Sequence, residues 1–290
     1  MIAFLQSIIS GLGTGVIYAV IALGFSIVYK TTRVVNFAHG QYLVVAGILG
    51  SIFTRNLGWP MFVACLAVIA LGIVLGVGTE LVVFRVLGRP DPLVMTLGTV
   101  ALGILLEAAV LITTGGSTFG MEQFWGDDLS FLTITVTSQM IWNVLIAVGL
   151  TVALMAFFSR TRQGISLQAA ADDRETAALY GISPGATTLW SFALAGALGA
   201  IGGLMLAPVS PVSFTVGLLF GLKGFAAAML GGLGSMQGAL VGGIAIGLAE
   251  TFTATYVNGL AAGIVAFVVL LGVLFFRPSG IFKEMAVERV

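Results

Sequence analysis

The first 29 residues of the chain read MIAFLQSIISGLGTGVIYAVIALGFSIVY (Met1–Tyr29) and contain no Lys, Arg, Asp or Glu. A helix needs about 20 predominantly apolar residues to cross a bilayer core about 30 Å thick. This stretch meets that length and lacks the period-two alternation that a membrane-spanning strand needs. It has no basic segment at its start and is too long for the apolar part of a cleaved signal peptide. The stretch therefore predicts a membrane-spanning helix.

Further apolar stretches of this kind follow along the whole chain. We expect membrane spans near residues 5–29, 36–54, 60–84, 93–113, 138–158, 187–207, 217–234, 237–256 and 259–276. The segment 217–234 contains Lys223 and is short and glycine-rich enough to be re-entrant rather than a full span. The sequence therefore predicts an all-α integral membrane protein, a bundle of eight or nine transmembrane helices in a single polytopic domain, 1–290.

The composition favours the same fold class. Of the 290 residues, 59% are hydrophobic and 8% are charged, with 12 basic and 12 acidic side chains. A soluble domain carries about 25% charged residues, so a soluble enzyme and a disordered chain are both excluded. The net charge of zero argues against a nucleic-acid-binding protein. The one cysteine, Cys65, cannot form a disulfide within the chain.

The distribution of Lys and Arg predicts the orientation, because cytoplasmic loops of membrane proteins are enriched in both. Ten of the twelve basic residues fall in segments 30–35, 85–92, 159–186 and the tail, which alternation of the spans places on one side. The loop 114–137 has three acidic residues and no basic one. We therefore expect the loop 159–186 and the C-terminus to be cytoplasmic and the loop 114–137 to be external. The N-terminus is external if all nine segments cross.

Glycine is about twice as frequent as usual, with 40 among 290 residues against about 7% in average proteins. Many glycines lie four residues apart, as do Gly72 and Gly76, and Gly199 and Gly203. On a helix this spacing places small residues on one face and lets two backbones approach closely. We expect tight helix packing along these faces, which are also poor enough in side chains to slide or rock.

The loop 159–186 contains one segment with helical character. Residues 166–180 combine small apolar residues with a run of four charged ones, Gly181 ends the run, and Pro184 prevents its continuation. Ser166 is suited to the N-cap position. We expect one short amphipathic helix lying against the membrane. From the residues alone, an ordinary connecting helix and a functional contact are equally consistent with it.

Ionisable residues also fall within the expected spans, where a charge costs about 2.5–3.5 kcal/mol on insertion scales. Glu80 lies five residues before Arg85, so we expect local pairing. Glu107 lies near the middle of its span and has no partner nearby in the sequence. Lys223 and Glu250 lie on successive, antiparallel segments. We hypothesise that these two form an ion pair that closes or orients the cytoplasmic half of a pathway.

His39 is the only histidine and lies in the run Asn36-Phe37-Ala38-His39-Gly40. One imidazole without neighbouring Cys, Asp or His does not make a metal site, and no Ser or Cys nucleophile accompanies it in sequence. We expect Asn36 to cap the second helix and His39 to hydrogen-bond to backbone at its start. The alternative is that both residues line a cytoplasmic gate. The sequence thus predicts no catalytic residue, no metal site and no cofactor.

The expected external loop 114–137 carries a short aromatic cluster, Phe124 and Trp125, next to two aspartates. Aromatic residues of this kind anchor membrane proteins at the bilayer interface. The same cluster would equally suit a docking surface for a soluble protein.

Three segments carry a more specific signal. They are Gly11–Gly40 with its Asn-Phe-Ala-His-Gly run, the loop segment Gly164–Gly185, and Gly221–Ser235 with Lys-Gly-Phe and Leu-Gly-Gly-Leu-Gly-Ser runs. They resemble the smaller permease subunit of bacterial and archaeal ABC importers for branched-chain amino acids, and the likeness extends from Gly11 to Ile281. The resemblance leaves the substrate open, because relatives of similar sequence import urea, amides or aromatic acids.

This resemblance implies a set of partners in a bacterial inner membrane: a second permease subunit, two ATP-binding subunits and an external substrate-binding protein. It also implies that the helix in 159–186 is a coupling helix seated in a groove of an ATP-binding subunit. The residues that match the family pattern there are Asp173, Ala177, Gly181 and Ile182. The hypothetical pathway or gate residues are Asn36, His39, Glu107, Lys223 and Glu250.

An ion-coupled secondary transporter of small organic solutes is the alternative, because it too has glycine-interrupted spans and membrane carboxylates. The chain contains no Gly-x-x-x-x-Gly-Lys-Ser/Thr phosphate-binding run, so an ATP-driven system would need separate ATPase chains. A membrane enzyme would need clustered His, Asp or Cys residues. In a passive channel, the expected helix at 166–180 would have no function.

Overall fold

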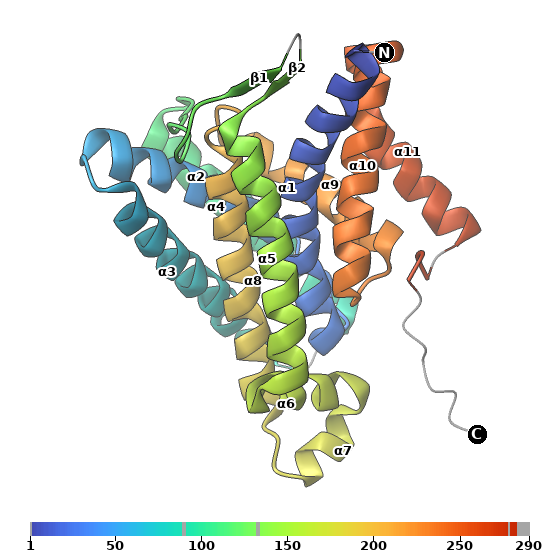
Figure 1. Ribbon diagram of the computed structural model, residues 1–290. Helices are drawn as coiled ribbons and strands as arrows, with labels where there is room; N and C mark the ends of the chain where they lie inside the picture. The colour runs from blue at the N-terminus through green and yellow to red at the C-terminus, as the bar shows by residue number, and fades with distance from the viewer. Residues whose placement is uncertain (1, 89–90, 132–133, 278, 283–290) are drawn as a thin grey trace.

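The structure is a computed structural model that describes residues 2–88, 91–131, 134–277 and 279–282. Helices dominate it (Figure 1). The α-helices are α1 (Ile2–Thr32), α2 (His39–Ser51), α3 (Met61–Thr79), α4 (Pro92–Thr114), α5 (Ser138–Arg160), α6 (Arg162–Asp172), α7 (Arg174–Leu179), α8 (Pro184–Leu206), α9 (Val216–Gly231), α10 (Met236–Tyr256) and α11 (Gly259–Phe276). Two π-helical turns, η1 (Ile52–Asn56) and η2 (Glu80–Arg85), extend α2 and α3.

Among the described residues, seven helices are long and apolar enough to cross a membrane. They are α1, α3 together with η2, α4, α5, α8, α10 and α11. The expectation of a helical, multi-pass membrane protein is confirmed at this level. The two remaining expected spans, 36–54 and 217–234, correspond to the shorter helices α2 and α9.

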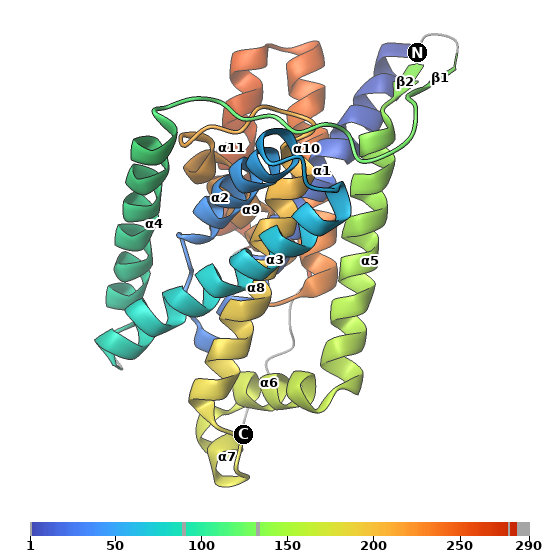
Figure 2. The same cartoon turned by 90° about the vertical axis from the view of Figure 1, so that its left-hand side faces the viewer.

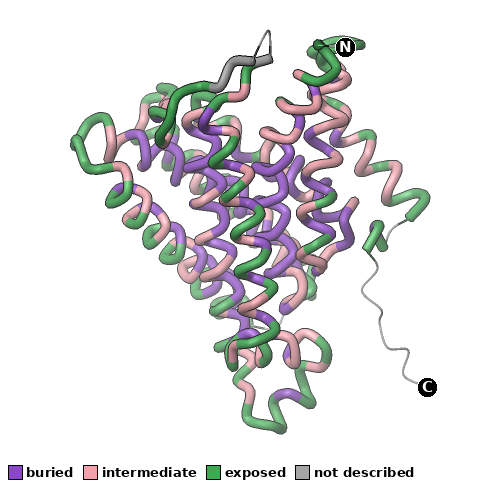
Figure 3. Tube along the Cα trace, viewed as in Figure 1, coloured by how far each residue is buried: buried purple, intermediate pink, exposed green. Residues whose placement is uncertain are grey.

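The helices are arranged around a buried centre (Figure 3). Most of α1 and α8 is buried, whereas α4 and α11 are largely exposed. The helices α6 and α7 lie at one end of the molecule, and the N-terminus and the hairpin of β1 (Leu129–Phe131) and β2 (Ile134–Val136) lie at the other (Figure 1). The expected loops 159–186 and 114–137 therefore lie at opposite ends.

Glycine faces bring the central helices together as their spacing predicts. A methyl group built on Gly76 of α3 would overlap the carbonyl oxygen of Phe192 on α8, and one built on Gly196 of α8 would overlap the carbonyl oxygen of Gly72. The same applies between α1 and α10, where Gly247 lies against the backbone of Gly15. Backbones this close leave no room for a larger residue, so these glycines fix the helix spacing.

The start of α2 differs from the expected span at residue 36. The chain leaves α1 at Arg33, which has a left-handed backbone conformation (φ 58°), and runs without helical structure to Ala38. Figure 2 shows it rising from the lower end of α1 to the start of α2. α2 begins at His39 with Ala38 as its N-cap, and no side chain caps it. The prediction that Asn36 caps this helix is wrong.

Candidate functional site

Asn36 organises the non-helical segment before α2 instead of capping the helix. Its Oδ1 accepts a hydrogen bond from the backbone N–H of Ala38 (3.1 Å), and its Nδ2 donates to the hydroxyl of Tyr42 (3.2 Å). The Tyr42 hydroxyl donates in turn to Oγ1 of Thr79 on α3 (2.6 Å). From α4, Thr99 Oγ1 accepts from the N–H of Phe37 (3.1 Å). Side chains thus satisfy backbone groups that lack helical partners inside an apolar protein.

His39 is buried between the rings of Phe25 and Tyr42, with ring centroids 5.1 Å and 5.6 Å away. A methyl group on Gly24 would overlap its imidazole, so that glycine makes the space for the ring. The ring lies against the backbone of Ile21, but neither ring nitrogen reaches hydrogen-bond geometry with any described residue. The backbone of Ile21 is thus the group that the expected hydrogen bond from His39 would reach, at a geometry that falls short of a hydrogen bond.

Lys223 and Glu250 meet in the protein interior. Lys223 Nζ lies 2.5 Å from Glu250 Oε1, and both side chains are mostly buried. Tyr18 of α1 joins them, because its hydroxyl donates to Glu250 Oε2 (2.7 Å) and accepts from Lys223 Nζ (3.3 Å). The hypothesised pairing is present, and Tyr18 is a third member that the sequence pattern does not predict.

The position of this pair differs from the hypothesis. A hydrogen bond between Ser7 and Thr255 places the end of α10 beside the start of α1. Glu250 therefore lies in the half of α10 nearer the N-terminal end of α1, away from α6 and α7. The pair therefore lies nearer the end opposite the loop 159–186, whereas the hypothesis placed it in the same half as that loop.

The other two carboxylates of the expected spans differ in their partners. Glu80 is buried, and its Oε2 lies 3.8 Å from Arg85 Nη2, which confirms the local pairing. Glu107 on α4 accepts a hydrogen bond from Nε2 of Gln41 on α2 (3.2 Å). Gln41 lies 66 residues from Glu107 along the chain, and no sequence motif predicts this contact.

The loop 159–186 forms two helices rather than the expected single helix over 166–180. Thr161, not Ser166, caps α6 by accepting from the N–H of Gly164 (3.0 Å). Asp173 has extended backbone (φ −151°) and caps α7 by accepting from the N–H groups of Glu175 and Thr176. A capping carboxylate competes with helix continuation, so the helix is interrupted at Asp173.

The four residues expected at an ATPase contact have different structural roles. Asp173 caps α7, Ala177 is buried, and Gly181 adopts φ 82° so that the N–H of Ile182 can donate to the carbonyl of Ala177 (3.1 Å). These residues build the end of the loop. The side chains that this end presents to solvent are Leu179 and Tyr180, which are 87% and 84% exposed.

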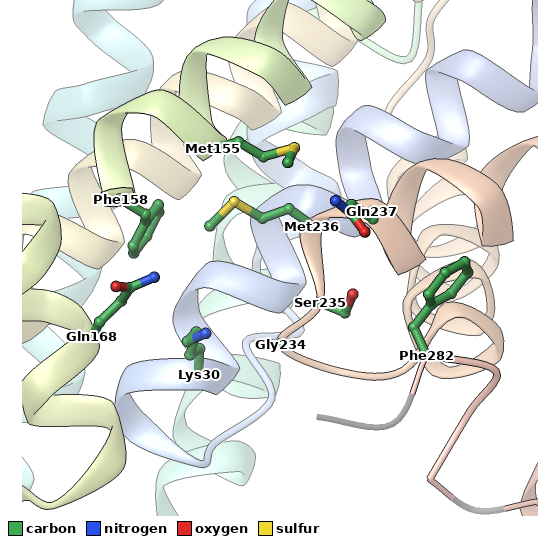
Figure 4. A pocket seen from close by; sticks show the side chains of 9 residues that line it. All are labelled: Lys30, Met155, Phe158, Gln168, Gly234, Ser235, Met236, Gln237 and Phe282. Carbon is green, nitrogen blue, oxygen red and sulfur yellow. The ribbon is translucent and has the colours of Figure 1, made fainter. Parts of the chain in front are cut away.

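The loop is also connected to the long helices. Arg174 Nη2 donates to Thr188 Oγ1 at the start of α8 (3.2 Å). Beside α6 lies an open cavity of about 430 Å³ into which Gln168 of α6 and Lys30 of α1 point (Figure 4). Its other walls come from the end of α5, the turn between α9 and α10, and Phe282. The backbone N–H of Phe282 donates to the carbonyl of Gly231 (3.0 Å), which ties the end of the described chain to α9.

At the opposite end, the aromatic cluster of loop 114–137 packs on α5. Trp142 Nε1 donates to the carbonyl of Trp125 (2.9 Å), and the Trp125 side chain is more than half exposed. Phe119 of this loop pairs through its backbone with Val212, which lies in the loop that joins α8 to α9. Among the described residues, no group of three or more His, Cys, Asp or Glu side chains could hold a metal ion.

The fold defines a multi-pass helical membrane protein with two short helices, α6 and α7, at one end. The chain matches, over residues 7–274, the family model described as the permease component of branched-chain amino acid transport systems, and it belongs to that family. The resemblance given by its sequence motifs is thereby confirmed.

Individual relatives cover nearly the whole chain. The chain is similar to the high-affinity branched-chain amino acid transport system permease protein BraD of Pseudomonas aeruginosa, with 30% identity over 99% of this chain and 98% of the relative. It is 29% identical to LivH of Escherichia coli, with the same coverage. It is 25% identical to a probable LivH permease of Methanocaldococcus jannaschii, over 90% of this chain and 87% of the relative. Among solved structures, PsaBC from Streptococcus pneumoniae in complex with Fab matches 95% of this chain and 92% of that chain, with 14% identity and a TM-score of 0.49.

Proposed function

We propose that this protein is a transmembrane permease subunit of an ABC importer that forms part of the pathway for branched-chain or related small amino acids, amides or organic acids. The family match over residues 7–274 is the observation that carries the proposal. The chain itself catalyses no reaction. Separate subunits supply ATP hydrolysis, because the sequence contains no phosphate-binding run of its own.

In the proposed assembly this chain pairs with a second permease subunit. Two ATP-binding subunits and an external substrate-binding protein complete the importer, which lies in a bacterial inner membrane. Two conformations alternate, and each is stabilised by differential contacts with nucleotide and with the loaded binding protein. The largely exposed α4 and α11 leave apolar surface for lipid or for the second permease.

We propose a topology of nine crossing segments within one permease domain. Seven of these segments are the long helices. The other two are shorter: α2 together with η1, and α9. The cavity shared by Lys30 and the α9–α10 turn supports this, because it places the end of α9 beside the end of α1. With 159–186 cytoplasmic, the N-terminus and loop 114–137 are external. Arg277 ends α11 on the cytoplasmic side, and the tail from 283 onward lies outside the described residues.

For coupling to the ATPase we propose that α7 and its exposed end dock in a groove of an ATP-binding subunit. Asp173, Ala177, Gly181 and Ile182 shape this end, and Leu179 and Tyr180 make the apolar contact. The hydrogen bond from Arg174 to Thr188 then transmits displacement of α7 to α8, which is one of the two most buried long helices. Asn36, His39, Lys223 and Glu250 act as gate or pathway residues where the short helices α2 and α9 meet the long ones.

Purification in mild detergent tests the assembly. A tagged chain should bring with it an ATP-binding subunit and a second permease, and the purified complex should hydrolyse ATP. A chain that purifies alone, from membranes that also contain these subunits, contradicts the proposal and favours the ion-coupled transporter.

A further inference from the structure

A cavity of about 280 Å³ lies between α2, α4 and α9. Its lining includes Phe37, Gln41, Gly103, Glu107, Leu218 and Leu222. Apart from Gln41 and Glu107, these residues offer apolar or glycine surface. The cavity is slightly smaller than the pockets of about 300–1,000 Å³ that hold drug-sized ligands, so it suits a small solute.

Glu107 is the carboxylate of this cavity, and its surroundings differ from those of the other carboxylates in the membrane-spanning helices. Glu80 has Arg85 and Glu250 has Lys223 within ion-pair distance. Among the described residues, Glu107 has one hydrogen bond, from Gln41, and no ion pair. A carboxylate at membrane depth usually has a cationic partner, so a cation is the group that this site is suited to accept.

Gln41 gives a second, independent indication of a ligand. Its side chain is 3% exposed, and its Oε1 is buried without a hydrogen-bond donor among the described residues. Most buried polar atoms in folded proteins are hydrogen-bonded, so an unsatisfied one calls for an explanation. A ligand that brings several N–H donors would satisfy the Glu107 carboxylate, and rotation of the Gln41 amide away from Gly217 on binding would bring its Oε1 to the same donors. A primary ammonium group has three such donors.

The position of the cavity agrees with entry of a solute from the end that carries loop 114–137. Glu107 lies in the half of α4 that leads into this loop, and Leu218 lies in the first turn of α9. Ile104 and Leu218 line the cavity and are more than half exposed. Lys223 follows Leu222 directly on α9, so the same short helix carries the cavity wall and the ion pair with Glu250.

We propose that this cavity binds the ammonium group and the branched apolar side chain of the transported amino acid, with Glu107 and Gln41 holding the ammonium. The inference rests on the proposed import of amino acids and assigns the residues that recognise one part of the cargo. The apolar wall formed by Phe37, Leu218 and Leu222 takes the hydrocarbon part. Compounds that resemble the transported amino acid but lack the ammonium group bind poorly at this position.

Protection of a single thiol from alkylation tests the site without requiring transport. The experiment uses the purified complex in a Cys65→Ala background, because Cys65 is the only cysteine of the chain. Ile104→Cys places a thiol at the cavity, and Ile112→Cys places a matched, exposed thiol on the same helix away from the cavity. N-ethylmaleimide labels each variant in the presence of leucine, 3-methylbutylamine or 4-methylpentanoate.

Leucine and 3-methylbutylamine should slow labelling of Ile104→Cys by about tenfold when present at about ten times their dissociation constants. The compound that lacks the amine, 4-methylpentanoate, should leave the rate unchanged, and the rate at Ile112→Cys should not respond to any of the three. Adding Glu107→Gln should weaken protection by about tenfold, because a charged hydrogen-bond partner is lost. The same charge removal at Glu122, an exposed residue of loop 114–137, should have no effect.

Three results would overturn the proposal: no protection by leucine or the amine, equal protection at both positions, or protection that Glu107→Gln leaves intact. Labelling of Ile104→Cys that is blocked in the complex without any ligand would also overturn it, because a side chain of a neighbouring subunit would then occupy the cavity. ATP hydrolysis by the same preparation reports separately on the proposed importer. A complex that hydrolyses ATP but shows no protection refutes the site alone.

Discussion

Lys223 on α9 and Glu250 on α10 form an ion pair at 2.5 Å, and the hydroxyl of Tyr18 on α1 hydrogen-bonds to both. Three helices are therefore joined at one point in the interior. Each charge is stabilised by the other, because a charge left without its counter-ion in this largely buried position would be poorly hydrated.

Removing one member of the pair should destabilise the protein more than removing both. We expect Lys223→Met to lower stability by about 3–5 kcal/mol, because it leaves the Glu250 carboxylate unpaired. The double variant Lys223→Met with Glu250→Leu should recover a large part of that loss, since no buried charge remains. Thermal unfolding of the three proteins in detergent measures this, and a double variant that is less stable than either single variant would refute the explanation.

The contact between α3 and α8 gives a second prediction. We expect Gly76→Ala to cost about 1–3 kcal/mol, because the added methyl group would overlap the backbone carbonyl of Phe192. Gly78→Ala is the matched control two residues along the same helix, because nothing lies within 4 Å of a methyl group there. The amount of folded protein recovered after heating compares the two. Equal losses would show that α3 and α8 are not packed as described.

The exposed end of α7 gives a third prediction. Replacing Leu179 and Tyr180 with serine should leave the stability of the chain unchanged, because both side chains are more than 80% exposed. The same change should reduce binding of the ATP-binding subunit by about tenfold or more, since a tyrosine buried at an interface is among the side chains that contribute most to binding. Val209→Ser, at an exposed position in the loop between α8 and α9, is the control for a lost apolar surface residue. Unaltered copurification of the ATP-binding subunit would remove these two residues from the contact.

Asp173 gives a fourth prediction, which separates loop shape from direct contact. Asp173→Ala should destabilise α7 by about 0.5–2 kcal/mol, because the cap for the N–H groups of Glu175 and Thr176 is lost. Asp173→Asn keeps a capping oxygen and should behave nearly as the unaltered chain. Hydrogen exchange at the amides of 175–180 reports the difference. Equal exchange in both variants would show that the carboxylate acts through its charge rather than as a cap.

Much of the fold could be predicted from the sequence, because long runs without charge have one physical solution in a bilayer. The pairing of Lys223 with Glu250 followed from the same cost of isolated charge. The late start of α2 could not be predicted in this way, since Asn36 binds the backbone N–H of Ala38 and the hydroxyl of Tyr42, and both contacts depend on the folded segment. Likewise, nothing in the local pattern relates Gln41 to Glu107.

The interruption at Asp173 did leave a signal in the sequence. An aspartate with an acidic residue, Glu175, in the turn that follows it is a suitable helix start, and Asp173 lies within the run that was expected to continue as one helix. The alanine content favours a continuous helix, but the capping hydrogen bonds of Asp173 interrupt it. Leu179 and Tyr180 are exposed because α7 ends at this point. The residues that match the family pattern shape this end of the loop, and they are therefore not the residues that face solvent.

In the proposed importer, ATP hydrolysed in other subunits moves this chain. Uptake of radiolabelled leucine into proteoliposomes that contain the copurified complex and its binding protein distinguishes transport driven by ATP from transport driven by an ion gradient. We predict accumulation above the external concentration that requires ATP on the side of α7 and does not change when proton and sodium gradients are collapsed. Uphill uptake by this chain alone, without nucleotide and driven by an ion gradient, would contradict the account.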